Sequence, residues 1–140
     1  MSTLVRPEIS KKNDSWISKH RYYELKHFCL QYPEWKRKLL EANYIHSHSV
    51  VGLDGKAQVE FVDTVGEEAV KLEKYKKKIH EVETACNEAD PELQLYLLKA
   101  LTEGVTFEYL KMVMKMPCGR SSFYKAYRKA FWVLDKIKAV

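Results

Sequence analysis

The fold is decided by the stretch VTFEYLKMVMKMPCGRSSFYKAYRKAFWVLDKIKAV at residues 105–140. Thr106 can cap a helix from Phe107 to about Lys115, and a last helix begins near Arg120, after a proline and a glycine that interrupt the first. Apolar residues recur at helical spacing along the last helix, which indicates a core-facing side: Phe123, Tyr127, Ala130, Phe131, Leu134 and Ile137. The pattern predicts a short helix, a tight turn and a longer basic helix.

A further helix precedes this stretch over residues 90–104. Asp90 suits a helix cap, Pro91 the first helical position and Glu92 the first turn, while Gly104 is a natural C-terminal cap. Residues 90–140 therefore form a predicted three-helix unit with the layout of a helix-turn-helix.

A long helix is predicted over residues 66–89. Thr64 and Glu67 fit a capping box at its start. Its apolar residues step by three and four along one narrow seam: Leu72, Tyr75, Ile79, Val82, Cys86 and Ala89. Such a seam either lies on the core of the same chain or pairs with a second copy, so this segment is a linking or dimerisation helix.

Residues 1–65 are predicted to hold an N-terminal helical hairpin and a connecting loop. The first helix begins near Trp16, after a cap at residues 13–15, and carries an apolar stripe through Trp16, Tyr23 and Leu30. It ends at Pro33, which suits the first turn of a second, short helix over 33–42. Residues 43–65 read as a long connection or a weak two-stranded excursion, and we favour the connection.

The composition agrees with an all-α fold. The chain has 140 residues, enough for one domain with its own core, and only five Gly and four Pro, too few for a turn-rich sandwich. Three cysteines give no paired disulfide framework. No stretch has the length and apolarity of a signal peptide or a membrane span, so we expect a protein of the cytoplasm without a membrane partner.

Positive charge is concentrated at the C-terminal end. Residues 111–140 hold eight Lys/Arg against Asp135 alone, whereas residues 1–110 hold 16 Lys/Arg against 18 Asp/Glu. This asymmetry favours a polyanionic partner, double-stranded DNA first, although a charged run can also be a solvated helix face. The candidate DNA-binding residues lie opposite the apolar side of the last helix or near its start: Arg120, Ser121, Ser122, Tyr124, Lys125, Arg128, Lys129, Lys111 and Lys115. Ser and Arg can reach base edges, and the lysines would lie near phosphates.

The motifs GVTFEYL at 104–110 and RSSFYKAYRKAF at 120–131 resemble the DNA-binding end of sigma-factor-type helix-turn-helix domains. The whole chain is similar to the RinA and ArpU late-gene transcriptional regulators of phages of Gram-positive hosts, most closely over 90–140, recognisably over 16–42 and not over 44–65. The resemblance implies that Arg120, Ser121, Ser122, Lys125 and Arg128 lie on the recognition helix and that phage packaging or lysis genes are activated. Cys118 and Gly119 make the turn about two residues longer than in the sigma-type pattern.

Catalytic and metal chemistry find little support in the sequence. The chain has no glycine-rich phosphate loop, no nucleophile elbow and no zinc-ligand spacing around His20, His27, His46, His48 or His80, so we expect neither enzyme activity nor a metal or other cofactor. Cys118 lies beside a helix start and near Arg120, which would lower the pKa of its thiol and suit a redox role, but we favour an inert turn cysteine.

The sequence therefore predicts a sequence-specific duplex-DNA-binding transcriptional regulator of a phage, acting as a homodimer in the cytoplasm of the bacterial host. One alternative is a small-terminase-like subunit that recognises DNA for packaging and forms a ring. Another is a helical protein-interaction module that binds host RNA polymerase through the middle helix or the 16–42 hairpin.

Overall fold

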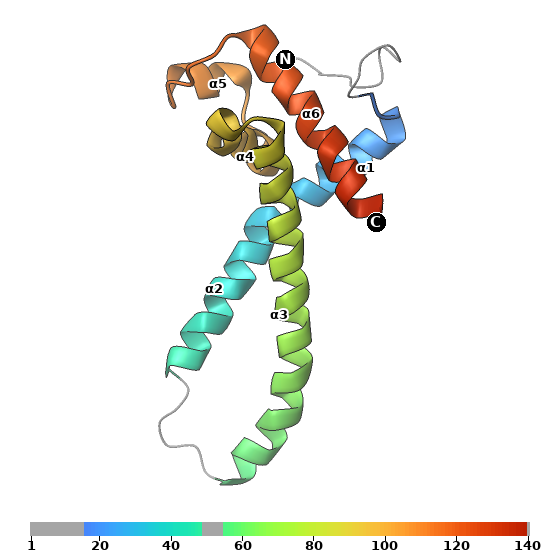
Figure 1. Cartoon of the computed structure of the whole chain (residues 1–140). Coiled ribbons are helices and arrows are strands. Elements are labelled where there is room, and N and C mark those ends of the chain that lie inside the picture. The colour runs from blue at the N-terminus through green and yellow to red at the C-terminus, as the bar shows by residue number, and fades with distance from the viewer. Residues whose placement is uncertain (1–15, 49–54, 140) are drawn as a thin grey trace. The chain divides into compact units, whose positions relative to one another are not determined.

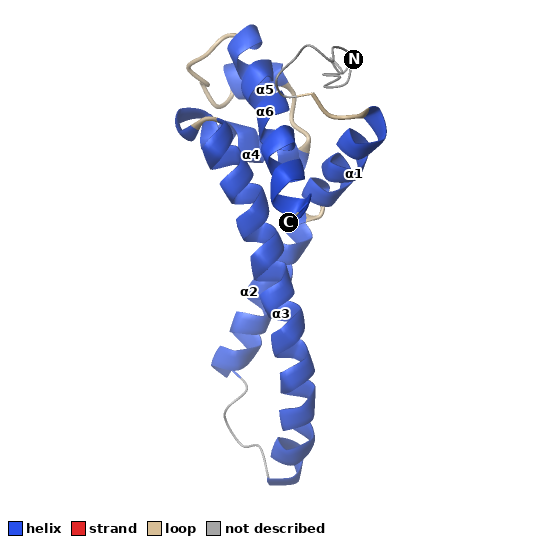
Figure 2. Ribbon diagram, turned by 45° about the vertical axis from the view of Figure 1, so that its right-hand side comes forward, coloured by secondary structure: helices blue, strands red, loops and turns tan. Residues whose placement is uncertain are grey.

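The computed structural model describes the backbone of residues 16–48 and 55–139 and the side chains of residues 16–44 and 66–139. Every regular element in these ranges is helical, which confirms the predicted all-α fold (Figures 1 and 2). The elements are α1 (Lys19–Leu30), α2 (Tyr32–His48), α3 (Gly55–Ala89), the 3-10 turn η2 (Pro91–Leu93), α4 (Gln94–Glu103), α5 (Phe107–Met112) and α6 (Arg120–Ala139).

The chain forms two compact units. One comprises α1 together with everything from Glu81 onward, and the other spans Tyr32–His80. The three predicted segments, 1–65, 66–89 and 90–140, divide the chain differently, because α1 joins the C-terminal helices and α3 contributes to both units. We call residues 16–31 with 81–139 the C-terminal unit and Tyr32–His80 the hairpin unit.

The hairpin unit pairs α2 with the first part of α3, which run alongside each other in opposite directions (Figures 1 and 2). Trp35 of α2 is buried, and Lys78 Nζ of α3 lies 5.6 Å from the centre of its ring. The predicted hairpin of the first helix with residues 33–42 is corrected accordingly, since the two helices belong to different units. Pro33 does lie in the first turn of α2, as expected.

The predicted connection over residues 43–65 is wrong for most of its length. Helix α2 continues to His48 and α3 already begins at Gly55, so Thr64 lies inside α3 and its capping box starts no helix. Extending an existing helix adds one hydrogen bond per residue without a new nucleation cost, so neighbouring helical turns can carry β-branched residues of modest propensity.

The C-terminal unit is built around the buried side of α6. Helix α6 packs against α1 and α4, and α4 packs against α1 and η2. Fully buried side chains come from each of the longer elements of this unit: Leu25, Val82, Leu97, Leu101, Leu110, Phe123, Phe131 and Leu134. The buried stripe of α1 is Tyr22, Leu25 and Cys29. A stripe through Trp16, Tyr23 and Leu30 was expected from the sequence, and the observed one differs because Trp16 precedes the helix and Leu30 is exposed.

Short-range signals set the ends of these helices. Ser18 Oγ accepts a hydrogen bond from the Arg21 amide, so α1 begins after Ser18, and the expected caps at residues 13–15 lie outside the described residues. Asp90 caps η2, Thr106 caps α5 and Gly104 adopts the left-handed conformation at the end of α4 (φ 70°). The predicted boundaries at Asp90, Gly104, Thr106 and Arg120 are confirmed.

The apolar seam of α3 is used within the single chain. Ile79, Val82 and Cys86 are buried, and Leu72, Tyr75 and Ala89 are half-buried. Ile79, Val82 and Cys86 are therefore covered within the single chain.

Aromatic rings connect α6 to α1 inside the C-terminal unit. The Tyr22 ring lies 5.0 Å from that of Phe131, and the Tyr22 and Tyr127 hydroxyls share a hydrogen bond of 3.1 Å. Burial, and then the proximity of Tyr22, raise the pKa of Tyr127 well above its usual value of 10.0. The folded state thus favours the neutral phenol.

We expect Tyr127→Phe to lower the free energy of unfolding by about 1 kcal/mol at neutral pH, because one buried hydrogen bond is lost. Because folding raises the pKa of Tyr127, the neutral phenol stabilises the folded state fully below the unfolded pKa, near 10.0. This stabilisation is lost as the pH rises towards the higher folded pKa. The difference between the two proteins should therefore narrow above pH 10. Urea unfolding of both proteins measures this difference in the free energy of unfolding, with Tyr109→Phe on the exposed side of α5 as control. A difference that stays constant at all pH values would contradict the prediction.

Candidate nucleic-acid interface

Helix α6 exposes one continuous stripe of polar and cationic side chains. Its buried residues lie on one side, and positions spaced by three and four residues emerge on the other. Ser121, Ser122, Lys125, Lys129 and Lys136 are exposed, and Arg128 and Trp132 are half-buried between them. We call Lys125, Arg128, Lys129 and Lys136 the cationic face of α6.

The positive charge of this face is largely uncompensated by acidic side chains. Asp135 is the one carboxylate in α6, and its Oδ1 accepts a hydrogen bond of 2.6 Å from Arg21 Nε of α1. Within the described part of the chain, no carboxylate lies within ion-pair distance of the four cations. Four cations on about three turns of one helix create a local positive potential that attracts phosphate groups.

Trp132 is a residue that the sequence analysis missed. It is half-buried among the cations, and Lys136 Nζ lies 5.0 Å from the centre of its ring. A position three residues after Lys129 and four before Lys136 is on the outward side of a helix, so the spacing could have revealed it.

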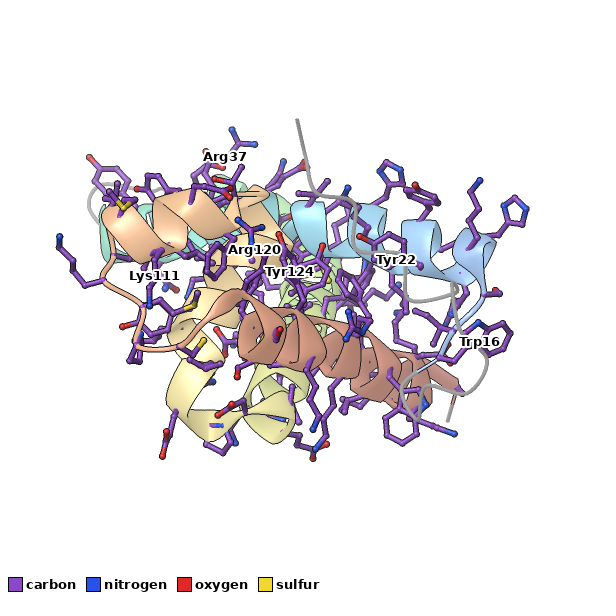
Figure 3. All side chains as sticks on the ribbon, turned by 90° about the horizontal axis from the view of Figure 1, so that it is seen from above. Trp16, Tyr22, Arg37, Lys111, Arg120 and Tyr124 are labelled. Atoms are coloured by element: carbon purple, nitrogen blue, oxygen red, sulfur yellow. The ribbon has the colours of Figure 1, made fainter. Side chains whose placement is uncertain are left out.

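Arg120, the first residue of α6, is held by α5. Its Nη2 lies 2.5 Å from Glu108 Oε2, and its guanidinium carbon lies 4.6 Å from the centre of the Phe107 ring. Figure 3 shows Arg120 between α5 and α6, with Tyr124 beside it. The ion pair lowers the pKa of Glu108, and it makes Arg120 a residue that positions α6 against α5.

Lys111 is likewise engaged within the protein. Its Nζ donates hydrogen bonds to the carbonyl oxygens of Met116 (3.1 Å) and Cys118 (2.9 Å), so it holds the loop that leads to α6 (Figure 3). That loop is longer than the tight turn expected from the sequence, since α5 ends at Met112, before the expected Lys115, and α6 begins at Arg120. Lys115 is exposed in it with a left-handed backbone (φ 58°).

The nine predicted DNA-binding residues therefore fall into two groups. Ser121, Ser122, Lys125, Arg128 and Lys129 lie together on the outward side of α6, and Tyr124 borders them with its ring against those of Phe107, Phe123 and Tyr127. Arg120 and Lys111 hold the junction of α5 and α6, and Lys115 lies in the loop between these helices.

A lowered pKa, the alternative considered for Cys118, is contradicted. Partial burial raises the pKa of its thiol, and this effect exceeds the lowering by Lys111, whereas Arg120 points its charge towards Glu108. Cys29 and Cys86 are buried free thiols, and burial raises the pKa of Cys86 to about 12. These thiols are neutral at physiological pH.

Other kinds of site are not evident in the described residues. No group of three or more metal-ligating side chains gathers there, and His46 and His48 have side chains outside the described range. No helix in the described residues is long and apolar enough to cross a membrane.

No family model, curated protein or solved structure gives a significant match to this chain. Its function is therefore argued from the cationic face of α6 and the residues around it.

Proposed function

We propose that this chain binds duplex DNA through the outward side of α6. The observation that carries the proposal is the cationic face, with four cations on one side of one helix and no carboxylate paired to them among the described side chains. An α-helix fits the major groove of B-form DNA, where cations along its length neutralise the phosphates on both sides.

The first turns of α6 would carry any base readout. Ser121 and Ser122 are small and exposed, so they allow the backbone to approach base edges, and Arg128 is long enough to reach a guanine. Lys125, Lys129 and Lys136 would bind phosphates, which position the helix without reading the sequence. Trp132 adds a flat apolar side chain between these lysines.

The resemblance to RinA and ArpU regulators supports a regulatory role, in which the chain acts as a transcriptional regulator of a phage in the cytoplasm of its bacterial host. Dimer binding to a two-fold symmetric site would suit such a regulator. A dimer interface would then use a surface other than the seam of α3, because Ile79, Val82 and Cys86 are buried.

Fluorescence anisotropy with labelled duplex DNA tests the proposal. If Lys125, Lys129 and Lys136 each contact a phosphate, they should contribute about −2.7 to the slope of log affinity against log salt. Absence of binding at low salt would overturn it. Light scattering on the complex separates a dimeric regulator from a packaging ring of many subunits.

We expect Glu108→Gln to strengthen DNA binding by roughly threefold to tenfold, because it removes a negative charge near the start of α6 and frees Arg120 for a phosphate. The same titration measures the change. Glu103→Gln, which releases Lys99 on α4, removes an equal charge elsewhere and is the matched control. Equal affinities of the two variants would show that Arg120 serves only to position α6.

A second candidate function is a protein-interaction module, favoured by an apolar patch on α5. Met112 is 72% exposed, Val113 60% and Tyr109 40%, and the three lie within five residues. A host RNA polymerase subunit is one partner that the sequence analysis proposed. Capture of polymerase by the wild-type chain in the absence of DNA, and its loss in Met112→Ser, would support this role, which is compatible with DNA binding.

A further inference from the structure

The hairpin unit has a strong charge asymmetry along its length. Residues 32–38 and 71–80 hold eight Lys/Arg against Glu34 and Glu73, a net charge of +6. Residues 39–70 hold one Lys against six Asp/Glu, a net charge of −5. The total of the unit is close to zero, which is why the overall charge of residues 1–110 hides this separation.

Antiparallel pairing brings the two cationic runs to the same end. Lys78 lies over Trp35, and a hollow between the helices is lined by Lys38, Glu41 and Ala42 of α2 and by Glu68, Lys71 and Tyr75 of α3. The two glutamates mark the border between the cationic and the acidic part of the unit. Residues 36–38 are therefore level with residues 71–78. We call the cations of these two ranges the basic collar.

The basic collar is poorly neutralised by the protein. Its cations are exposed, except that Lys78 is half-buried. Among the described side chains, Lys76 and Glu73 form the only ion pair that involves a collar cation (3.4 Å). Lys74 and Lys77 are three apart on α3, as are Lys71 and Lys74, and like charges at this spacing repel each other. Glu67 and Glu73, four residues before Lys71 and Lys77, offset part of this repulsion. A net positive charge remains, which favours an anionic partner.

The chemistry of the basic collar favours a phosphodiester backbone. Its exposed side chains are Lys and Arg with Glu34 and Glu73. Among the described residues, Val70 is the one large apolar side chain exposed beside Lys74 and Lys77, whereas Leu40 and Tyr44 are exposed in the acidic part of the unit. Protein interfaces are depleted in Lys and rely on apolar anchors, and a membrane-surface helix needs an apolar face. Phosphates require only positive charge.

We propose that the basic collar is a second DNA-binding surface, which contacts the phosphate backbone independently of the cationic face of α6. It adds affinity without sequence preference and makes binding more sensitive to salt than α6 alone would. Lys74 and Lys77 are its central contacts on α3, and Arg37 and Lys38 are its contacts on α2.

The test compares Lys74→Gln/Lys77→Gln with Lys19→Gln/Lys99→Gln, which removes two cations from α1 and α4. Gln keeps helix propensity, so both proteins should fold. In anisotropy titrations with duplex DNA of random sequence, the collar variant should show a salt slope shallower by about 1.8 and an affinity about 30-fold lower at roughly 0.15 M salt. The control should bind like the wild type. Thermal unfolding should show the collar variant at least as stable as the wild type.

Lys125→Gln/Lys129→Gln, measured alongside, separates this inference from the proposed function. A collar variant that binds like the control, while the α6 variant is weakened, overturns the collar and leaves α6 as the DNA-binding surface. The reverse result retains the collar and overturns α6. Binding of the same variants to vesicles of phosphatidylserine and phosphatidylcholine is measured as a third comparison. Loss of vesicle binding with unchanged DNA affinity in the collar variant would assign the collar to membranes and overturn the proposal.

Discussion

Replacing Phe131 by alanine is expected to lower the free energy of unfolding by about 3–5 kcal/mol, which is a large part of the stability of a small domain. Phe131 is completely buried, and the centre of its ring lies 5.0 Å from the ring centres of both Tyr22 and Tyr127. Truncation removes the contacts that hold α6 against α1. The cavity is lined by large rings that cannot easily close it.

Urea unfolding followed by circular dichroism measures this loss. Lys129→Ala, two residues earlier on the exposed side of α6, is the control and should change the free energy of unfolding by less than about 0.5 kcal/mol. Similar effects of the two substitutions would mean that the orientation of α6 about its axis is wrong. That result would also remove the basis for the cationic face.

Replacing Lys125, Arg128 and Lys129 together by glutamine is expected to weaken duplex binding roughly 100-fold at about 0.15 M salt. The lost phosphate contacts of Lys125 and Lys129 each remove the favourable release of about 0.9 counterion, so the salt slope should become shallower by about 1.8. The loss of Arg128 removes a base contact as well. The variant should remain fully helical, because Lys125 and Lys129 are exposed and Arg128 is half-buried. Anisotropy titrations at several salt concentrations measure the change.

Lys19→Gln/Lys26→Gln/Lys99→Gln removes the same number of cations from α1 and α4, outside both the cationic face and the basic collar, and separates local contact from net charge. This control should keep the affinity and the salt slope of the wild type. An α6 variant that keeps wild-type affinity and slope would show that α6 does not contact DNA.

The parts of the fold that were predicted correctly depend on neighbouring residues. The Asp90-Pro91 start, the Gly104 cap, the Thr106 cap and the beginning of α6 at Arg120 are each decided within a few residues. The apolar spacing of α6 likewise identified its buried side, because a 20-residue amphipathic helix has a strong periodic signal.

The parts that were missed depend on distant residues. The pairing of α2 with the first part of α3 depends on which apolar faces fit each other, and local sequence does not reveal it. Apolar residues recur only weakly at helical spacing along α1, so the sequence pattern did not identify Tyr22 and Leu25 as its buried residues.

In the candidate interface, too, some features follow from neighbouring residues and others from distant ones. The outward placement of Lys125 and Lys129 follows from helical spacing alone. The engagement of Arg120 by Glu108 and of Lys111 by the Met116 and Cys118 carbonyls requires α5 and its loop to be in place. Likewise, the basic collar exists only because two cationic runs more than 30 residues apart in sequence meet at one end of the hairpin unit.

An amide-resolved NMR titration with duplex DNA at low salt tests the central claim most directly, since it reports each backbone position. The account predicts that the largest shifts follow the outward side of α6, at Ser121, Ser122, Lys125, Arg128, Lys129, Trp132 and Lys136, with weaker shifts in the basic collar. No shifts on α6 at saturating DNA, or shifts confined to the α5 patch of Tyr109, Met112 and Val113, would contradict it.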